Sequence, residues 1–280
     1  MAEQSDSGGL PGDRGPEAGV RAGGLRPGVP PVTPPADLGE GEVAVLLAEV
    51  RASAGRVLAA VGALTDRQAR EPSTLPGWSR AHVLTHLARS ADAYRRLLTV
   101  ARTGAAPEPR PDAAALDRAL HEGAGRGAAE LVADLRGSLD GMAAAAGAMP
   151  AERWSVLVSA LAGWRHPAWF TLHRAWRELE THHVDLGLGR STADWPAGYV
   201  AWALDATAAT LAARGFPVAR LRATDLGREW PVAPAGPTVS GSGHALLAWL
   251  SGRGPAAGLR ADGPLPAPPG WPLPPVPGWG

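Results

Sequence analysis

The chain has 280 residues, of which 36 are Gly and 28 are Pro, yet 45% of its residues are apolar and 11 are Trp. This content is enough to bury a core once the Gly- and Pro-rich ends are set aside. Lys and Arg together balance Asp and Glu at 27 each, so no excess of charge favours binding to nucleic acid or to an anionic membrane surface. The lack of Cys excludes a disulfide framework, a thiolate zinc finger and a cysteine nucleophile.

The chain shows neither a membrane-spanning pattern nor a targeting pattern. No run of about 18 apolar residues is present, and the N-terminus lacks the basic and apolar segments of a signal peptide. We therefore expect a cytoplasmic protein. All the basic residues are Arg, and Lys, Ile and Asn are missing, which is associated with a gene from a high-GC genome.

The composition and the pattern of apolar residues change near residue 40, and the first predicted elements follow from this change. Residues 1–36 contain 8 Gly and 7 Pro without an apolar period, which predicts a disordered tail. From Glu40, apolar residues recur every three or four positions, which predicts a helix of about 20 to 25 residues. Ser79 is a suitable N-cap for a second helix that continues to Leu98.

The middle of the chain predicts more helices. A weak helical pattern covers residues 113–124, and a stronger one covers residues 128–146. Residues 154–164 are ambiguous between strand and helix. We expect a strong helix to start at His166 and Pro167, with the proline in its first turn, and to end at Gly187 or Gly189. A further helix is predicted over 196–214. Four or five helices joined by loops are typical of a helix bundle.

After residue 215, alternating patterns predict strands over 218–224, 229–232, 237–242 and 259–261, with a short helix over 244–250. The predicted fold is therefore mainly α, with a four-helix bundle at 37–214 and a small α+β domain at 215–272. A Pro-rich tail is predicted at 273–280.

Two predicted helices carry residues with metal-binding side chains. Glu178 and His182 are four residues apart, about 40° around a helix, so both side chains can approach one ion. A histidine on a facing helix, His82 or His86, would complete a three-ligand site with an open fourth position. This pattern is typical of catalytic zinc, and bundles commonly build such sites from facing helices.

Other interpretations of these residues stay open. A Glu and a His at this spacing are often a solvated surface pair, and Glu180 with His183 forms a rival pair. His86 lies between two leucines, where it could be a half-buried core residue. We expect three further histidines to be solvated or to cap helices: His121, His166 and His173.

Three blocks of the sequence carry a resemblance to a known family. Residues 75–92 (LPGWSRAHVLTHLARSAD), 177–187 (RELETHHVDLG, with the pattern E-x-x-x-H-x-x-D) and 243–253 (GHALLAWLSGR) occur in the right order. Together they resemble the mycothiol-dependent maleylpyruvate isomerase family over about residues 40–272. This resemblance implies a DinB-like four-helix bundle followed by a small domain of sterol-carrier-like topology.

The resemblance also implies the site. It makes His86, Glu178 and His182 the ligands of a zinc or another divalent ion, because the spacing to Asp185 selects this pair, and it leaves His82 outside the site. Mycothiol would be the thiol cofactor, and its metal-bound thiolate would add to a conjugated double bond of maleylpyruvate before rotation and elimination. Because that substrate is a dicarboxylate, Arg253 is the predicted catalytic cation, unless it pairs with an acidic neighbour or a helix C-terminus.

Two other functions remain open at this point. One is a mycothiol S-transferase, which would use the same metal and thiol but keep the adduct. The other is a non-catalytic zinc-binding or regulatory protein on the same fold. In the enzymatic cases the expected partners are a small-molecule substrate and a low-molecular-weight thiol, without nucleic acid or membrane, and the chain is expected to be a monomer or weak dimer.

Overall fold

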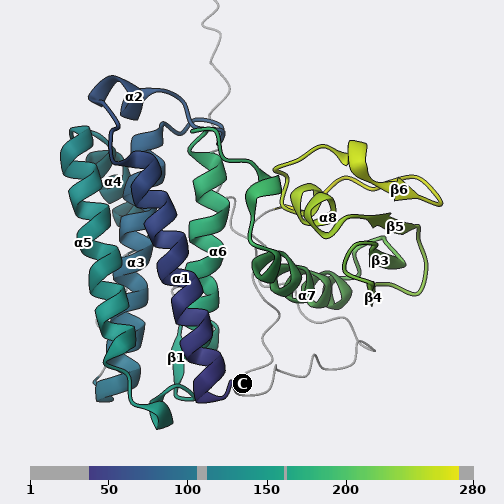
Figure 1. Ribbon diagram of the computed structural model, residues 1–280, viewed down its shortest axis with the longest axis horizontal. Coiled ribbons are helices and arrows are strands. Elements are labelled where there is room, and N and C mark those ends of the chain that lie inside the picture. Colours follow the sequence, from purple (N-terminus) through teal and green to yellow (C-terminus); the bar gives the residue numbers. More distant parts are fainter. Residues whose placement is uncertain (1–37, 106–111, 161–162, 271–280) are drawn as a thin grey trace, which may run out of the picture. The chain divides into compact units, whose positions relative to one another are not determined.

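The computed structural model describes residues 38–105, 112–160 and 163–270. The predicted tails at 1–36 and 273–280 lie outside the described residues. Within the described ranges, no helix combines the length and the apolar character that crossing a membrane requires. Most of the helices precede a small sheet along the chain, and α8 lies between its strands β5 and β6 (Figure 1), so the predicted mainly α class with a small α+β part is confirmed.

Four long helices run side by side and form the predicted bundle (Figure 1). Helices α1 and α3 each pack against both α5 and α6, which closes the bundle around a common core. The four are α1 (Glu40–Val61), α3 (Arg80–Thr103), α5 (Ala128–Gly147) and α6 (Phe170–Asp185). Two shorter helices, α2 (Asp66–Arg70) and α4 (Ala113–Ala124), lie between them along the chain, and the first of these has no counterpart in the sequence prediction.

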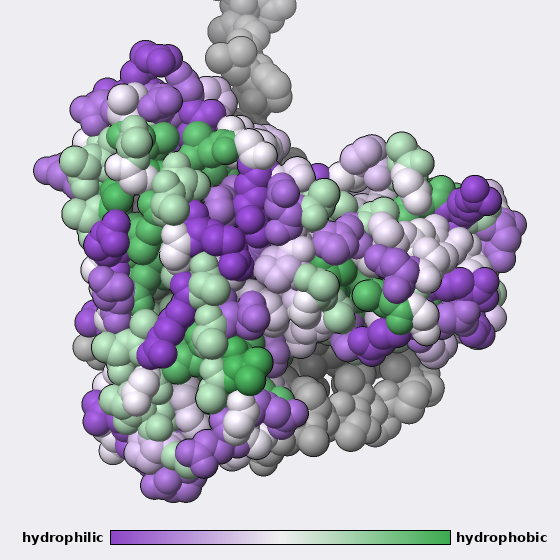
Figure 2. Space-filling model, in the orientation of Figure 1, coloured by the Kyte–Doolittle hydropathy of each residue, from purple (hydrophilic) through white to green (hydrophobic). Residues whose placement is uncertain are grey.

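The core of the bundle consists of the apolar positions that recur every three or four residues. Fully buried examples are Val57, Leu84, Leu98, Leu131 and Leu135. Burying each such side chain contributes about 1.5–3 kcal/mol before the entropy of ordering is counted. On the face shown in Figure 2, apolar and hydrophilic side chains are interspersed along the bundle, and Val45 of α1 is 65% exposed.

The start of α3 is fixed by the predicted cap. The Ser79 hydroxyl accepts a hydrogen bond from the His82 backbone N–H at 3.4 Å, and His82 Nδ1 accepts one from the Ser79 N–H at 3.2 Å. This reciprocal capping arrangement satisfies two helix-end donors. It also occupies His82 at the first turn and places His86 one turn further along α3.

The prediction of a helix starting at His166 and Pro167 is wrong. Residues Arg165–Pro167 form strand β2, which pairs antiparallel with β1 (Leu157–Ser159), and α6 begins only at Phe170. In this hairpin Val158 lies opposite His166. The two strands pair with each other, and local periodicity does not reveal this pairing. The ambiguous segment 154–164 thus contains a strand.

The C-terminal region contains two helices and a four-stranded sheet. Helix α7 (Ala197–Arg214) packs against α8 (Gly243–Leu250) and against β4. The sheet has the order β4-β3-β5-β6, with β3 parallel to β5 and the other pairs antiparallel. Its strands are β3 (Arg220–Ala223), β4 (Arg228–Pro231), β5 (Thr238–Gly241) and β6 (Arg260–Ala261). These agree with the predicted strands, while the domain boundary at 214/215 stays a prediction.

Two helix ends bring the site together. Helix α6 ends at Asp185, and Gly187 follows with a φ of 63°. Helix α8 is followed by Gly252 with a φ of 68°, a left-handed conformation that glycine adopts without steric cost. The next residue, Arg253, donates its backbone N–H to the Ala248 carbonyl at 2.9 Å. Its side chain reaches the last residue of α6.

Candidate metal centre

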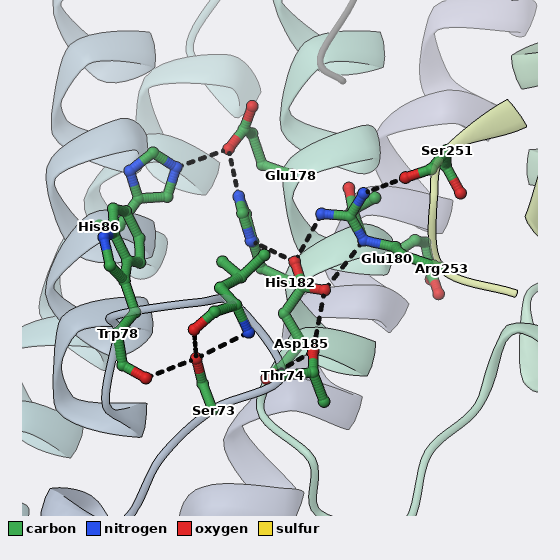
Figure 3. Close-up of polar contacts among 12 residues, drawn as sticks. Ser73, Thr74, Trp78, His86, Glu178, Glu180, His182, Asp185, Ser251 and Arg253 are labelled. Carbon is green, nitrogen blue, oxygen red and sulfur yellow. Dashed lines mark hydrogen bonds and ion pairs between the residues drawn. The ribbon is translucent and has the colours of Figure 1, made fainter. Parts of the chain in front are cut away.

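Three predicted ligands meet between α3 and α6 (Figure 3). One nitrogen or oxygen atom from each of His86, Glu178 and His182 lies within 4.8 Å of the others. Glu178 Oε2 lies 2.9 Å from His86 Nε2 and 3.3 Å from His182 Nε2. The spacing of four residues on α6 therefore places Glu178 and His182 on one side, as expected, and α3 supplies the third group. Ligation of a metal by this set stays a prediction.

The cluster is electrostatically coupled. Burial alone would raise the pKa of Glu178, but the hydrogen bonds to His182 and His86 outweigh it and hold the pKa well below its usual range. Burial disfavours the charged form of His182, but its hydrogen bonds to Asp185 and Glu178 raise its pKa to about 9. Without a metal, the protonated ring of His182 is therefore held by its hydrogen bonds to the carboxylates of Glu178 and Asp185. A cation bound here would have to displace the proton of His182, since imidazole ligands are neutral.

A buried carboxylate stands behind His182. Asp185 Oδ2 lies 2.9 Å from His182 Nδ1, and the side chain of Asp185 is only 1% exposed. Arg253 donates to it twice, from Nε at 2.9 Å and from Nη2 at 2.6 Å. Burial would raise the pKa of Asp185, but the bonds from His182 and Arg253 outweigh it and lower that pKa. Asp185 therefore connects the end of α8 to the cluster.

This arrangement fits a divalent metal. When a carboxylate accepts the N–H at Nδ1 of a histidine, the lone pair of that histidine is left on Nε2, facing the metal, and the ring is fixed in orientation. His182 has this geometry, because its Nε2 faces Glu178 while its Nδ1 faces Asp185. Two imidazoles and one carboxylate are a donor set suited to zinc and to other first-row divalent ions. The sequence analysis used Asp185 only to choose between the two Glu–His pairs, and it missed this supporting role.

Arg253 lies where the alternative interpretation of the sequence expected it, beside an acidic residue. Besides its two bonds to Asp185, it donates from Nη1 to the Ser251 carbonyl at 2.9 Å. Its side chain is 9% exposed. These contacts hold Asp185 in place, and direct contact of Arg253 with a substrate stays a prediction.

The rival pair does not assemble into a metal-binding cluster among the residues that the structure describes. Glu180 is buried and forms ion pairs with Arg56 at 2.7 Å and Arg190 at 2.9 Å, and its Oε1 accepts from the Ser53 hydroxyl at 2.5 Å. Burial lowers the pKa of His183 to about 4, so it is neutral at pH 7. Glu180 thus joins α1 to α6 and to the segment after α6.

Two of the histidines expected to be solvated are buried. His166 has no exposed surface and His173 is 9% exposed, because the β1–β2 hairpin and the aromatic residues around α6 cover them. His121 is 62% exposed on its side chain, as expected. An aromatic neighbour that sequence reasoning missed also lies at the cluster: the ring of Trp78 is 5.5 Å from the ring of His86 (Figure 3).

Comparisons with known proteins were made for the whole chain. Residues 50–187 match the family model described as "Mycothiol maleylpyruvate isomerase N-terminal domain", and this range includes all three candidate ligands. This match confirms the predicted resemblance and supports the prediction of an enzyme. No curated protein matches the chain.

Two solved structures are similar to the chain. One is a mycothiol-dependent maleylpyruvate isomerase, with a TM-score of 0.76 and 24% identity over 82% of this chain and 97% of that one. The other is a mutant of a mycothiol-dependent maleylpyruvate isomerase, with a TM-score of 0.74, the same identity and the same coverage. At this identity the likeness establishes the fold.

Proposed function

We propose that this chain, whose residues 50–187 belong to the mycothiol maleylpyruvate isomerase N-terminal domain family, is a mycothiol-dependent cis–trans isomerase of maleylpyruvate type. The observation that carries the proposal is the convergence of His86, Glu178 and His182 within 4.8 Å, inside the matched domain. The family match and the chemistry of this donor set support the same reaction.

His86, Glu178 and His182 would hold a zinc or similar ion. When bound, such an ion supplies positive charge that stabilises a thiolate at neutral pH. The chain itself contains no Cys, so the thiol has to come from a small molecule. The donor set of two neutral imidazoles and one carboxylate carries a single negative charge, so a bound divalent ion would leave the site with a net positive charge, which suits an anionic thiol.

The chain's own residues give the site its rigidity. Asp185 accepts the Nδ1 proton of His182 and so keeps Nε2 directed at the site. Arg253 keeps Asp185 ionised and fixed through two hydrogen bonds. The Trp78 ring packs against His86 from the loop before α3. We infer that Arg253 acts first as a positioning residue, through Asp185 and His182.

The proposed reaction balances without any other reagent. The thiolate adds to the conjugated double bond of the substrate, which forms a C–S bond and moves the electron pair onto the conjugated carbonyl oxygen. The former double bond is now single and rotates. Elimination breaks the C–S bond, restores the double bond in the trans form and returns the thiol unchanged.

An assay of isomer ratio and adduct mass tests this proposal. Purified, metal-loaded chain is incubated with mycothiol and maleylpyruvate, and the products are followed by absorbance and mass spectrometry. Conversion to the trans isomer without a retained adduct is the expected result. His86→Ala should lose this conversion, whereas His121→Ala, which removes an exposed imidazole on α4, should keep it.

Other outcomes of that assay would contradict the proposal. A product that retains mycothiol would identify an S-transferase on the same site. Absence of both products with metal-loaded protein would favour a non-catalytic role for the cluster.

A further inference from the structure

Helix α6 carries two arginines beside the candidate metal ligands. Arg174 precedes Glu178 by four residues, about 40° around the helix, and Arg177 flanks the same stripe. Thr181 follows Arg177 by four residues, and its hydroxyl donates to the Arg177 carbonyl. The two arginine residues therefore lie within one turn of Glu178 along α6.

Neither guanidinium has an acidic partner in the part of the chain that the structure describes. Three other partly buried arginines of the described chain are neutralised in this way, Arg80 by Glu71, Arg190 by Glu180 and Arg253 by Asp185, whereas Arg153 forms no such ion pair among the described residues. Within the described ranges, no carboxylate lies within 4.0 Å of a nitrogen of Arg174 or Arg177. An uncompensated, partly buried positive charge is unfavourable, and a bound anion would offset the two charges beside the cluster.

Arg174 is held in place by uncharged groups. Its guanidinium lies over the rings of Tyr94 and Trp164, with centroid distances of 4.9 and 5.0 Å. Its Nη1 lies 3.1 Å from Nε2 of the buried His166. Burial lowers the pKa of His166 to about 4, so this ring is neutral and accepts the hydrogen bond. The aromatic contacts orient the cation without cancelling its charge.

Arg177 is the less satisfied of the two. Its Nε is inaccessible to solvent and has no hydrogen-bond partner among the residues that the structure describes. Burial raises the pKa of Tyr199 and of Tyr94, and the positive charge of Arg177 opposes this rise at both hydroxyl groups. His173 does not compete for an anion, because burial, and secondarily Arg177, lowers its pKa to about 3. Buried polar atoms without partners are uncommon and call for an explanation.

We propose that Arg177, with Arg174 beside it, binds a carboxylate group of the substrate. This inference rests on the proposed function, and it assigns the residue through which the site distinguishes a dicarboxylate from a monocarboxylate. The planar guanidinium offers two parallel N–H donors to one carboxylate. Arg253 is less available for this task, since Asp185 already occupies its Nε and Nη2.

The experiment compares Arg177→Gln with Arg177→Lys and Arg174→Gln, all as full, metal-loaded chains. Arg118→Gln, on the exposed surface of α4, is the control. Steady-state kinetics with maleylpyruvate give KM and kcat, and calorimetry measures binding of adipate, a dicarboxylate that cannot react, and of its monomethyl ester. Unfolding is followed in parallel.

Arg177→Gln is expected to raise KM and the Kd for adipate by about 10- to 100-fold, the size of a lost charge-assisted pair of hydrogen bonds. The value of kcat should change by less than about twofold, Arg174→Gln should show a smaller rise in KM, and Arg177→Lys should recover part of the affinity. The wild type should bind adipate more tightly than the monoester. The Tm of Arg177→Gln should not fall, because no partner loses a bond.

Two results would overturn the proposal: an Arg177→Gln variant that binds adipate like the wild type, or a wild type that binds adipate no more tightly than its ester. A fall in Tm with unchanged affinity would likewise assign Arg177 to structure. The measurement of adipate binding and the measurement of isomerisation test the two proposals separately. Adipate binding that depends on Arg177, without isomerisation, would refute the proposed function alone, and isomerisation with an unchanged KM in Arg177→Gln would refute the carboxylate site alone.

Discussion

Replacement of His182 by Ala is expected to abolish stoichiometric metal binding. The change removes one of three ligands and also the group that links Glu178 to Asp185, since Nε2 of His182 faces the first carboxylate and Nδ1 the second. We expect occupancy below about a tenth of the wild-type value after dialysis, consistent with the loss of a principal ligand. Elemental analysis of purified protein measures this directly.

The control for that variant is His121→Ala, which removes an exposed imidazole far from α6 in sequence and should keep its metal. Circular dichroism of both variants checks that the helices remain. Unchanged occupancy in a folded His182→Ala variant would disprove the ligand assignment.

Replacement of Arg253 by Ala is expected to reduce both stability and turnover. The side chains of Arg253 and Asp185 are 9% and 1% exposed, so the variant leaves a buried carboxylate without its cation. Breaking such a pair costs about 3–5 kcal/mol of unfolding free energy. We expect kcat to fall by about 10- to 100-fold as well, the size of effect seen when a partner behind a metal-ligating histidine is removed. Denaturant unfolding and steady-state kinetics measure the two effects.

A double-mutant cycle with Asp185→Asn separates a positioning role from substrate contact. If Arg253 acts through Asp185, the double variant should be more stable than the sum of the single losses predicts, because no uncompensated charge remains. Arg253→Lys should restore little, since one ammonium group does not reproduce both hydrogen bonds. Wild-type stability with a large loss of kcat in Arg253→Ala would instead support direct contact with the substrate.

The bundle could be predicted from the sequence because its helices follow local signals. Apolar residues at spacings of three and four mark α1 and α5, and Ser79 marks the start of α3. The β1–β2 hairpin could not be predicted in this way. Its stability depends on pairing between two three-residue strands, and Pro167 is equally compatible with a helix start and with a short edge strand.

The candidate site, too, could be predicted only where local sequence signals determine it. The pair Glu178 and His182 follows from helical spacing, whereas the choice of His86 over His82 required the family resemblance. The structure supplies a physical reason for that choice, because His82 is engaged in capping α3. The contact between Arg253 and Asp185 joins residues 68 positions apart, which no local pattern reveals. Likewise, only the three-dimensional arrangement reveals that Arg174 and Arg177 lack acidic partners among the described residues.

We propose that a metal held by His86, Glu178 and His182 enables a thiol-dependent isomerisation. The most direct test is to remove metal from the purified chain, restore zinc in steps and measure the initial rate of maleylpyruvate isomerisation with and without mycothiol. We expect a rate that rises in proportion to bound zinc, reaches its limit at one ion per chain and requires mycothiol at every step. A rate that is independent of bound metal, or that persists in the absence of the thiol, would contradict it.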